Sequence, residues 1–178
     1  MAGIIRALAP DVELYSARVL GAALTGKAHV FARGLAWAIA HDLHVINLSL
    51  STTNDDWYGA FHELADRAAF KRAMVVGALS NETKASYPTE FSSVFSVAAR
   101  EGTDPERFAY NPDPPAEWGA PGIDVDVAWL DGTTIRATGN SFAAPHISGL
   151  VARVLAKHPG LTPFQMKTVL AALADNAA

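Results

Sequence analysis

The chain has 178 residues, of which 50% are hydrophobic, and its formal net charge is −4. This composition is enough for the apolar core of one domain and argues against a disordered chain. The acidic balance provides no basic surface for nucleic acid, and the lack of cysteine excludes disulfides and thiolate metal sites.

Strand and helix patterns alternate through the first hundred residues. In chain order we expect a strand over Glu13–Leu20, a helix over Ala28–Ala40, a strand over His44–Leu50, a helix over Trp57–Ala69, and strands over Ala73–Leu79 and Phe91–Ala99. The helices place apolar residues on one face. The short, apolar runs at 44–50 and 73–79 are typical of buried parallel strands.

The remainder of the chain begins with a proline-rich stretch, residues 101–122, which predicts a long loop with at most short strands. Beyond it we expect a hairpin of Asp124–Trp129 and Thr133–Ala137 around Asp131-Gly132, a helix with its apolar stripe over Ile147–Leu155, and a helix opened by the capping box Thr162-Pro163-Phe164-Gln165. The alternation predicts an α/β fold, with a mostly parallel sheet covered by helices.

The most informative stretch is Gly139-Asn140-Ser141-Phe142-Ala143-Ala144-Pro145-His146. A serine at the head of a helix lies beside unpaired backbone N–H groups and the positive end of the helix dipole. That placement exposes a nucleophile and favours the oxyanion that forms after attack. Serine is also among the preferred helix N-caps, so the stretch by itself leaves a structural role open.

The wider sequence resembles the subtilisin-like serine peptidases, the S8 or subtilase family. The stretch above is similar to the family signature Gly-Thr-Ser-x-Ala-x-Pro-His-x-x-Gly, with Gly149 as its last glycine. Further matching segments follow in the family order over essentially all 178 residues: Ala9–Tyr15, Val19–Gly21, Trp37–Ala40, Val45–Leu50, Val75–Ala78, Asn81, Tyr87-Pro88, Val94–Ala98 and Ala120–Gly122. The resemblance implies a three-layer subtilisin-like fold, with residues 1–178 forming a partial peptidase domain that is incomplete at its N-terminus.

The resemblance also implies roles for particular residues. Ser141 would be the nucleophile, and the side-chain amide of Asn81 would donate to the oxyanion. The segment of Ser49, Leu50 and Ser51 would pair with the substrate backbone, and Ala78, Leu79 and Ser80 would wall the pocket before the scissile bond. Both segments can equally be ordinary sheet-edge residues.

Several positions depart from the family pattern. Asn140 stands where threonine is usual, which we interpret as a change to another cap-forming polar residue. Leu79 and Ser80 replace smaller residues, and Ser51 replaces a glycine.

The rest of the catalytic triad is missing from this sequence. Subtilisins carry Asp, His and Ser in that order. Ala2-Gly3 resemble the last two residues of the family motif His-Gly-Thr-x-x-Ala-Gly, which puts the histidine four residues before Met1 and the aspartate further upstream. His146 is a poor substitute, because five helical residues rotate by about 140° and rise by about 7.5 Å. The remaining histidines are typical of surface or core positions.

Two functional hypotheses follow. In the first, the chain belongs to a serine endopeptidase that acts on polypeptides when complete. In the second, it is a non-catalytic binding or scaffold module, or one part of a split enzyme. An α/β-hydrolase is excluded, because only 37 residues follow Ser141. No cofactor or metal ion is expected. Loss of the aspartate strand would leave unpaired sheet edges, so we expect self-association or complementation by the missing segment.

Two further features concern location. No apolar run approaches the roughly 20 residues needed to span a bilayer. The first residues lack the cationic end and apolar core of a signal peptide. As written, we expect a cytoplasmic product with no membrane partner.

Overall fold

The sheet at the centre of the molecule is mostly parallel. The computed structural model describes residues 1–177 and places the strands in the order β1-β2-β3-β5-β4. The parallel strands are β1 (Val45–Leu48), β2 (Met74–Ala78), β3 (Phe95–Arg100) and β5 (Trp118–Pro121), and β4 (Ala109–Tyr110) runs antiparallel to β5. Every residue of β2 is buried, as expected for an inner parallel strand.

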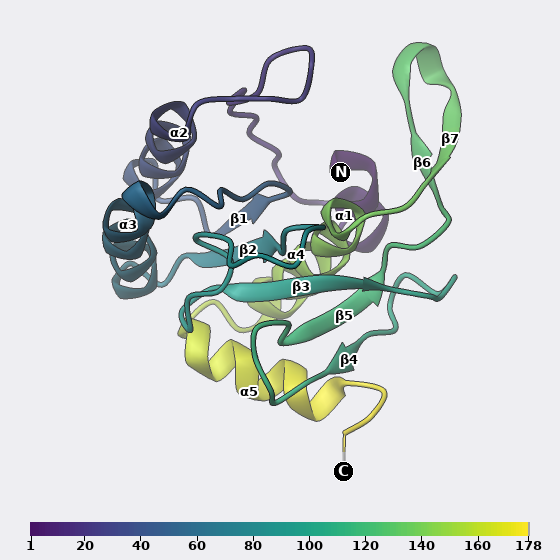
Figure 1. Ribbon diagram of the computed structural model, residues 1–178. Coiled ribbons are helices and arrows are strands. Elements are labelled where there is room, and N and C mark those ends of the chain that lie inside the picture. The colour runs from purple at the N-terminus through teal and green to yellow at the C-terminus, as the bar shows by residue number, and fades with distance from the viewer. Residues whose placement is uncertain (178) are drawn as a thin grey trace.

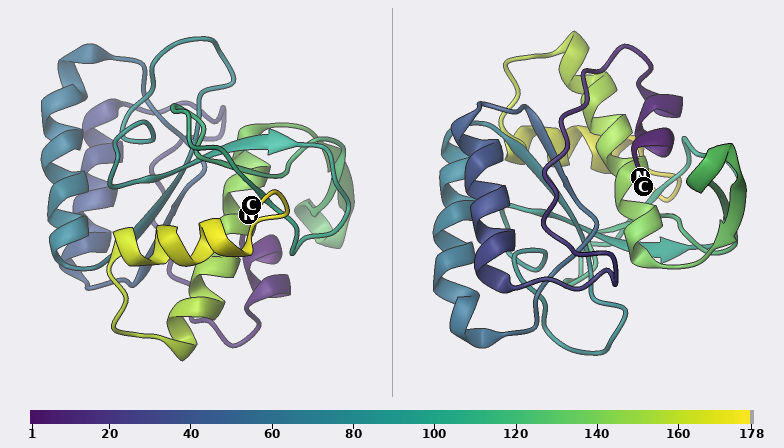
Figure 2. Two further views of the ribbon diagram at one scale, coloured as in Figure 1. Left: turned by 90° about the horizontal axis from the view of Figure 1, so that it is seen from below. Right: turned by 90° about the horizontal axis from the view of Figure 1, so that it is seen from above.

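Helices cover both faces of this sheet, which gives three layers (Figures 1 and 2). One face carries α2 (Ala28–Ala40) and α3 (Tyr58–Phe70), the latter preceded by the short 3-10 helix η1 (Asp55–Trp57). The other carries α4 (Asn140–Lys157) and α5 (Pro163–Leu173). Alternation along the strands builds the two cores: Ile46 and Val75 pack toward α2 and α3, whereas Met74 and Val76 pack toward α4 and α5.

Most of the predicted elements are confirmed. The helix over 28–40 has the predicted bounds, and the box at Thr162 and Gln165 has both of its hydrogen bonds. β3 begins four residues later than predicted. Its predicted first residues instead form turns after Pro88, with the Phe91 N–H donating to the Pro88 carbonyl at 3.1 Å.

The predicted strand over Glu13–Leu20 is wrong. These residues have no regular secondary structure and are mostly exposed. An isolated strand leaves its backbone groups unpaired, so a β pattern becomes a strand only where a neighbour accepts its hydrogen bonds. The segment has no such neighbour in the described chain, and β1, at the sheet edge, pairs only with β2.

Two features stand outside the sheet layers. A helix that the sequence reading did not predict, α1 (Ala2–Leu8), packs on α4 at Gly149. The hairpin of β6 (Val125–Ala128) and β7 (Thr134–Ala137) projects from the body and turns through the 3-10 helix η2 (Leu130–Gly132) (Figure 1). β7 leads directly into α4.

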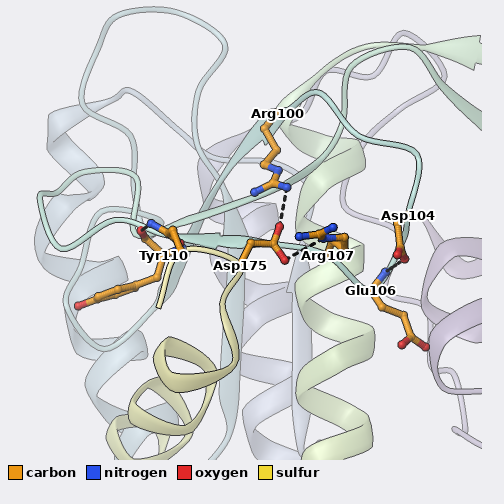
Figure 3. A network of polar contacts seen from close by, with 7 residues as sticks. Arg100, Asp104, Glu106, Arg107, Tyr110 and Asp175 are labelled. Atoms are coloured by element: carbon orange, nitrogen blue, oxygen red, sulfur yellow. Dashed lines mark hydrogen bonds and ion pairs between the residues drawn. The ribbon is translucent and has the colours of Figure 1, made fainter. Parts of the chain in front are cut away.

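The residues after α5 are tied back to the sheet (Figure 3). The carboxylate of Asp175 accepts hydrogen bonds from Arg100 at 2.7 Å and from Arg107 at 3.1 Å. Burial by itself would raise the pKa of Asp175, but these two guanidinium groups hold it below its ordinary value. Among residues 1–177, no helix is long and apolar enough to cross a membrane.

Candidate active site

The first turn of α4 carries the predicted nucleophile. Gly139 is the N-cap, with φ 156° and ψ 156°, a conformation that is essentially restricted to glycine. Ser141 is the second residue of the helix, and no side chain of its own segment caps the helix. Ser141 therefore does not cap α4. In this first turn the Phe142 N–H donates to the Gly139 carbonyl at 3.0 Å, whereas the Ser141 N–H donates to no described residue.

Asn140 attaches this turn to the carboxyl ends of two strands. Its side-chain nitrogen donates to the carbonyls of Leu79 and Ser80, both at 3.1 Å, and its side-chain oxygen accepts from the Ala99 N–H at 2.8 Å. The prediction that Asn140 acts as a cap-forming residue is wrong. The Asn140 side chain instead bonds to residues at the carboxyl ends of β2 and β3, because the first turn of α4 lies beside these ends.

Asn81 lies beside the same turn. Its side-chain oxygen accepts the Asn140 N–H at 3.1 Å. A backbone N–H can only donate, so this contact fixes which end of the amide is the oxygen. A Cβ atom built on Gly139 would lie 3.6 Å from the Ser141 hydroxyl oxygen and 3.8 Å from the Asn81 side-chain oxygen. Asn81 and Ser141 thus both lie within 4 Å of one position beside Gly139, at the start of α4.

The two segments that are predicted to bind substrate lie beside the same turn. Ser49, Leu50 and Ser51 follow β1, whereas Leu79 and Ser80 follow β2, and parallel strands end at a common edge. The Ser49 hydroxyl donates to the backbone carbonyl of Ser141 at 2.9 Å. Beyond this segment, Thr52 and Tyr87 exchange two backbone hydrogen bonds.

Ala78 differs from its neighbours in exposure. It is 3% exposed and belongs to the core between the sheet and α4. Leu79 and Ser80 are half-buried at the edge. The Leu79 N–H is already used, because it donates to Val97 at 3.0 Å.

No base reaches the Ser141 hydroxyl within residues 1–177. His146 is 7% exposed, and the Nδ1 of its ring lies 3.3 Å from the Pro105 carbonyl. The polar contacts of the His41 and His62 rings are to Trp37 on α2 and Asp66 on α3, within one turn of each residue. Burial lowers the pKa of His146, although the Pro105 contact opposes this effect.

The sequence reading missed Asn47. Its side chain bonds to Ser49 and Ser148, and so connects β1 with α4. In the sequence, the indication of a special role is one amide side chain in the otherwise apolar strand Val45–Leu48. Among the described residues, no group of three or more His, Asp or Glu side chains could hold a metal ion.

A three-layer α/β domain with a serine at a helix N-terminus and an asparagine beside it is the architecture of one class of serine peptidase domain. The sequence profile of the Subtilase family matches residues 1–178, and the chain belongs to that family.

Individual relatives agree with this assignment. The chain is 32% identical over 165 residues to the thermostable alkaline protease of Halalkalibacterium halodurans, covering 90% of this chain and 44% of that protein. It is 29% identical over 175 residues to subtilisin DY of Bacillus licheniformis, covering 95% and 63%. Sphericase has a similar fold, with a TM-score of 0.75 at 22% identity, over 90% of this chain and 60% of that one. The chain thus spans about half the length of the curated relatives that it matches.

Proposed function

We propose that this chain is the nucleophile-bearing part of a serine endopeptidase that hydrolyses polypeptides through an acyl-enzyme on Ser141. The observation that supports it most directly is the meeting of Ser141 and Asn81 at the start of α4. The free Ser141 backbone N–H and the Asn81 amide nitrogen are the kind of donors that a developing oxyanion needs.

The proposal includes a general base and its orienting carboxylate from outside these 178 residues. A serine hydroxyl is a weak nucleophile unless a base accepts its proton. The Ser141 hydroxyl has no histidine within hydrogen-bonding distance among the described residues, and His146 is held at Pro105. A segment that supplies the two groups would complete the triad.

Fluorophosphonate labelling and casein cleavage test the proposal. The 178-residue chain alone should neither label nor cleave casein above a Ser141→Ala control. The chain preceded by its upstream sequence, or mixed with a fragment carrying the missing Asp and His, should do both, and peptide mapping should locate the label on Ser141. No labelling of the completed protein would favour a binding or scaffold role, and labelling of a different residue would contradict Ser141 as the nucleophile.

A further inference from the structure

We propose that Asn47 is a positioning residue for Ser141, an inference that rests on the proposed function of that serine. The Asn47 amide acts through the Ser49 hydroxyl, which holds the backbone carbonyl of Ser141. Asn47 contacts no atom of the proposed reaction itself. We call this chain of hydrogen bonds from Asn47 through Ser49 to Ser141 the carbonyl relay.

The relay exists because α4 cannot satisfy the Ser141 carbonyl by itself. In an α-helix, the carbonyl of residue 141 accepts from the N–H of residue 145. Residue 145 is proline, which has no N–H. The carbonyl next to the proposed nucleophile is therefore left without its helical donor, and the Ser49 hydroxyl takes that place at 2.9 Å.

Asn47 sets the direction of the Ser49 hydroxyl. A serine has a single hydroxyl proton, so when Ser49 donates to Ser141 it can only accept from its other neighbour. The Asn47 side-chain nitrogen provides that donor at 3.0 Å. With the amide reversed, its oxygen would compete for the Ser49 proton, and the Ser141 carbonyl would lose its partner.

Ser148 holds the amide in the required orientation. Ser148 is 1% exposed, and its hydroxyl lies 2.9 Å from the Asn47 side-chain oxygen, which accepts from it. The Ala144 carbonyl, at 3.1 Å, competes for the single proton of this hydroxyl, and the Asn47 oxygen is the nearer acceptor. Because Ser148 is on α4, the amide of Asn47 is bonded at one end to that helix and at the other to Ser49.

The position of Asn47 indicates that the fold alone does not require an amide there. Its neighbours Ile46 and Leu48 pack in the core on the other face, and Val45 packs toward α4. An aliphatic side chain at 47 would suit such a surface, and even the half-buried amide of Asn47 is unfavourable there unless it is hydrogen-bonded. The relay provides the bonds, and it joins the nucleophile's backbone to the strand proposed to hold substrate.

Carbonyl chemical shifts in the 178-residue chain test the relay directly. Asn47→Asp should release the Ser49 proton from Ser141, because a carboxylate only accepts hydrogen bonds. The ¹³C resonance of the Ser141 carbonyl should then move upfield. Thr168→Ala removes a comparable helical hydroxyl from α5, which bonds Phe164 at 3.1 Å, and should leave that resonance in place.

Kinetics in the completed protein test the link to the reaction. Asn47→Asp and Asn47→Leu should lower kcat per labelled Ser141 by about 10- to 100-fold, the scale of a small misplacement, with KM changed less than about twofold. Ser49→Ala should act similarly, and Asn47→Asp with Ser49→Ala should be no worse than the worse single variant. Normalising to labelled sites removes any effect of unfolded protein.

The outcomes separate the two proposals. An unmoved Ser141 carbonyl resonance in Asn47→Asp, or an unchanged kcat per labelled site, overturns the positioning role. If both Asn47 variants fail to fold, Ser49→Ala tests the same Ser141 carbonyl while Asn47 is unchanged. If the completed wild-type protein never labels, the proposed function fails, and the carbonyl resonance still decides whether the relay forms.

Discussion

At the start of α4 the two ends of the Asn81 amide have different surroundings. The oxygen accepts the Asn140 N–H at 3.1 Å. The Asn81 side-chain nitrogen donates to none of the described residues. This nitrogen is the proposed donor to the oxyanion. A substitution that keeps the oxygen and removes the nitrogen can therefore separate the structural role of Asn81 from the catalytic one.

Asn81→Asp should make this separation. The carboxylate still accepts from Asn140, and its charge suits the helix N-terminus, so the melting temperature should be equal to or above that of the wild type. The labelling rate of Ser141 in the completed protein should fall by about 100- to 1,000-fold, the scale of removing one oxyanion donor. Asn81→Ala should lose both activity and about 1 kcal/mol of stability. Full activity in Asn81→Asp would remove the donor role.

His146 is a second residue whose surroundings have a measurable consequence. It is buried in α4 at 7% exposure, and burial lowers its pKa. The unfolded chain, in which the pKa returns to about 6.5, then binds the proton more readily than the folded chain. The sign follows from this difference: stability is greatest above that pH and is lost as the pH falls below it.

Urea unfolding between pH 7.5 and 5 should therefore show this loss. For one histidine the slope can reach about 1.4 kcal/mol per pH unit. His146→Gln should flatten the profile, even if it is less stable at pH 7.5. His158→Gln, at the exposed end of the same helix, should keep the wild-type profile. Identical slopes in wild type and His146→Gln would assign the acid sensitivity to other groups.

At the scale of elements, the contact between α1 and α4 depends on a glycine. A Cβ atom on Gly149 would lie 2.8 Å from Leu8 Cβ and 3.3 Å from the Ile5 carbonyl oxygen. Both neighbours are fixed by the α1 helix, so neither can move without displacing it. The last glycine of the signature stretch is thus required by helix packing.

Gly149→Ala should lower the free energy of unfolding by about 1–3 kcal/mol, as overpacking does. Gly59→Ala is the matched control, because Gly59 is also helical and a Cβ there would meet nothing within 4 Å. That change should leave stability unchanged or raise it by up to about 1 kcal/mol. Chemical denaturation of the two variants compares them directly. Equal effects would mean that α1 does not pack as described.

For the molecule as a whole, the main feature is an open side with a sheet edge and an exposed segment. Among the described residues β1 has only one neighbouring strand, and the irregular, mostly exposed segment 12–20 lies next to an open cavity of about 620 Å³ lined by Arg6 and Pro10–Tyr15. Leu14 and Tyr15 are 44% and 61% exposed. Unpaired strand edges and exposed apolar side chains favour association with another chain. We propose that the segment missing relative to the family relatives, or a second copy, covers this side.

Trypsin should detect the exposed segment. Arg18 should be cut well before the helical Arg33 and Arg67, because a protease needs an extended, accessible backbone. Arg18→Gln should remove that first cut, as mass spectrometry of the fragments would show. Addition of a completing segment should slow cleavage at Arg18. Resistance of Arg18 in a concentration-independent monomer would show that this side is already closed.

Much of the architecture could be predicted from the sequence. The α2 pattern, the buried strands β1 and β2, the Asp131-Gly132 hairpin and the Thr162 capping box depend on local periodicity and turn chemistry, which act over a few residues. The nucleophile and its asparagine were predicted from the resemblance, and the structure places them together. Their catalytic roles remain predictions.

The tertiary structure alone decided the remaining features. Residues 13–20 carry a β pattern but form no strand, because a strand is defined by a partner that the pattern does not specify. Gly149 and Leu8 are far apart in sequence, and only helix packing places them in contact. In the same way, Pro145 predicts that the Ser141 carbonyl lacks its helical donor, but not that Ser49 replaces it. Local sequence determines which groups need partners, and the fold determines which distant side chains provide them.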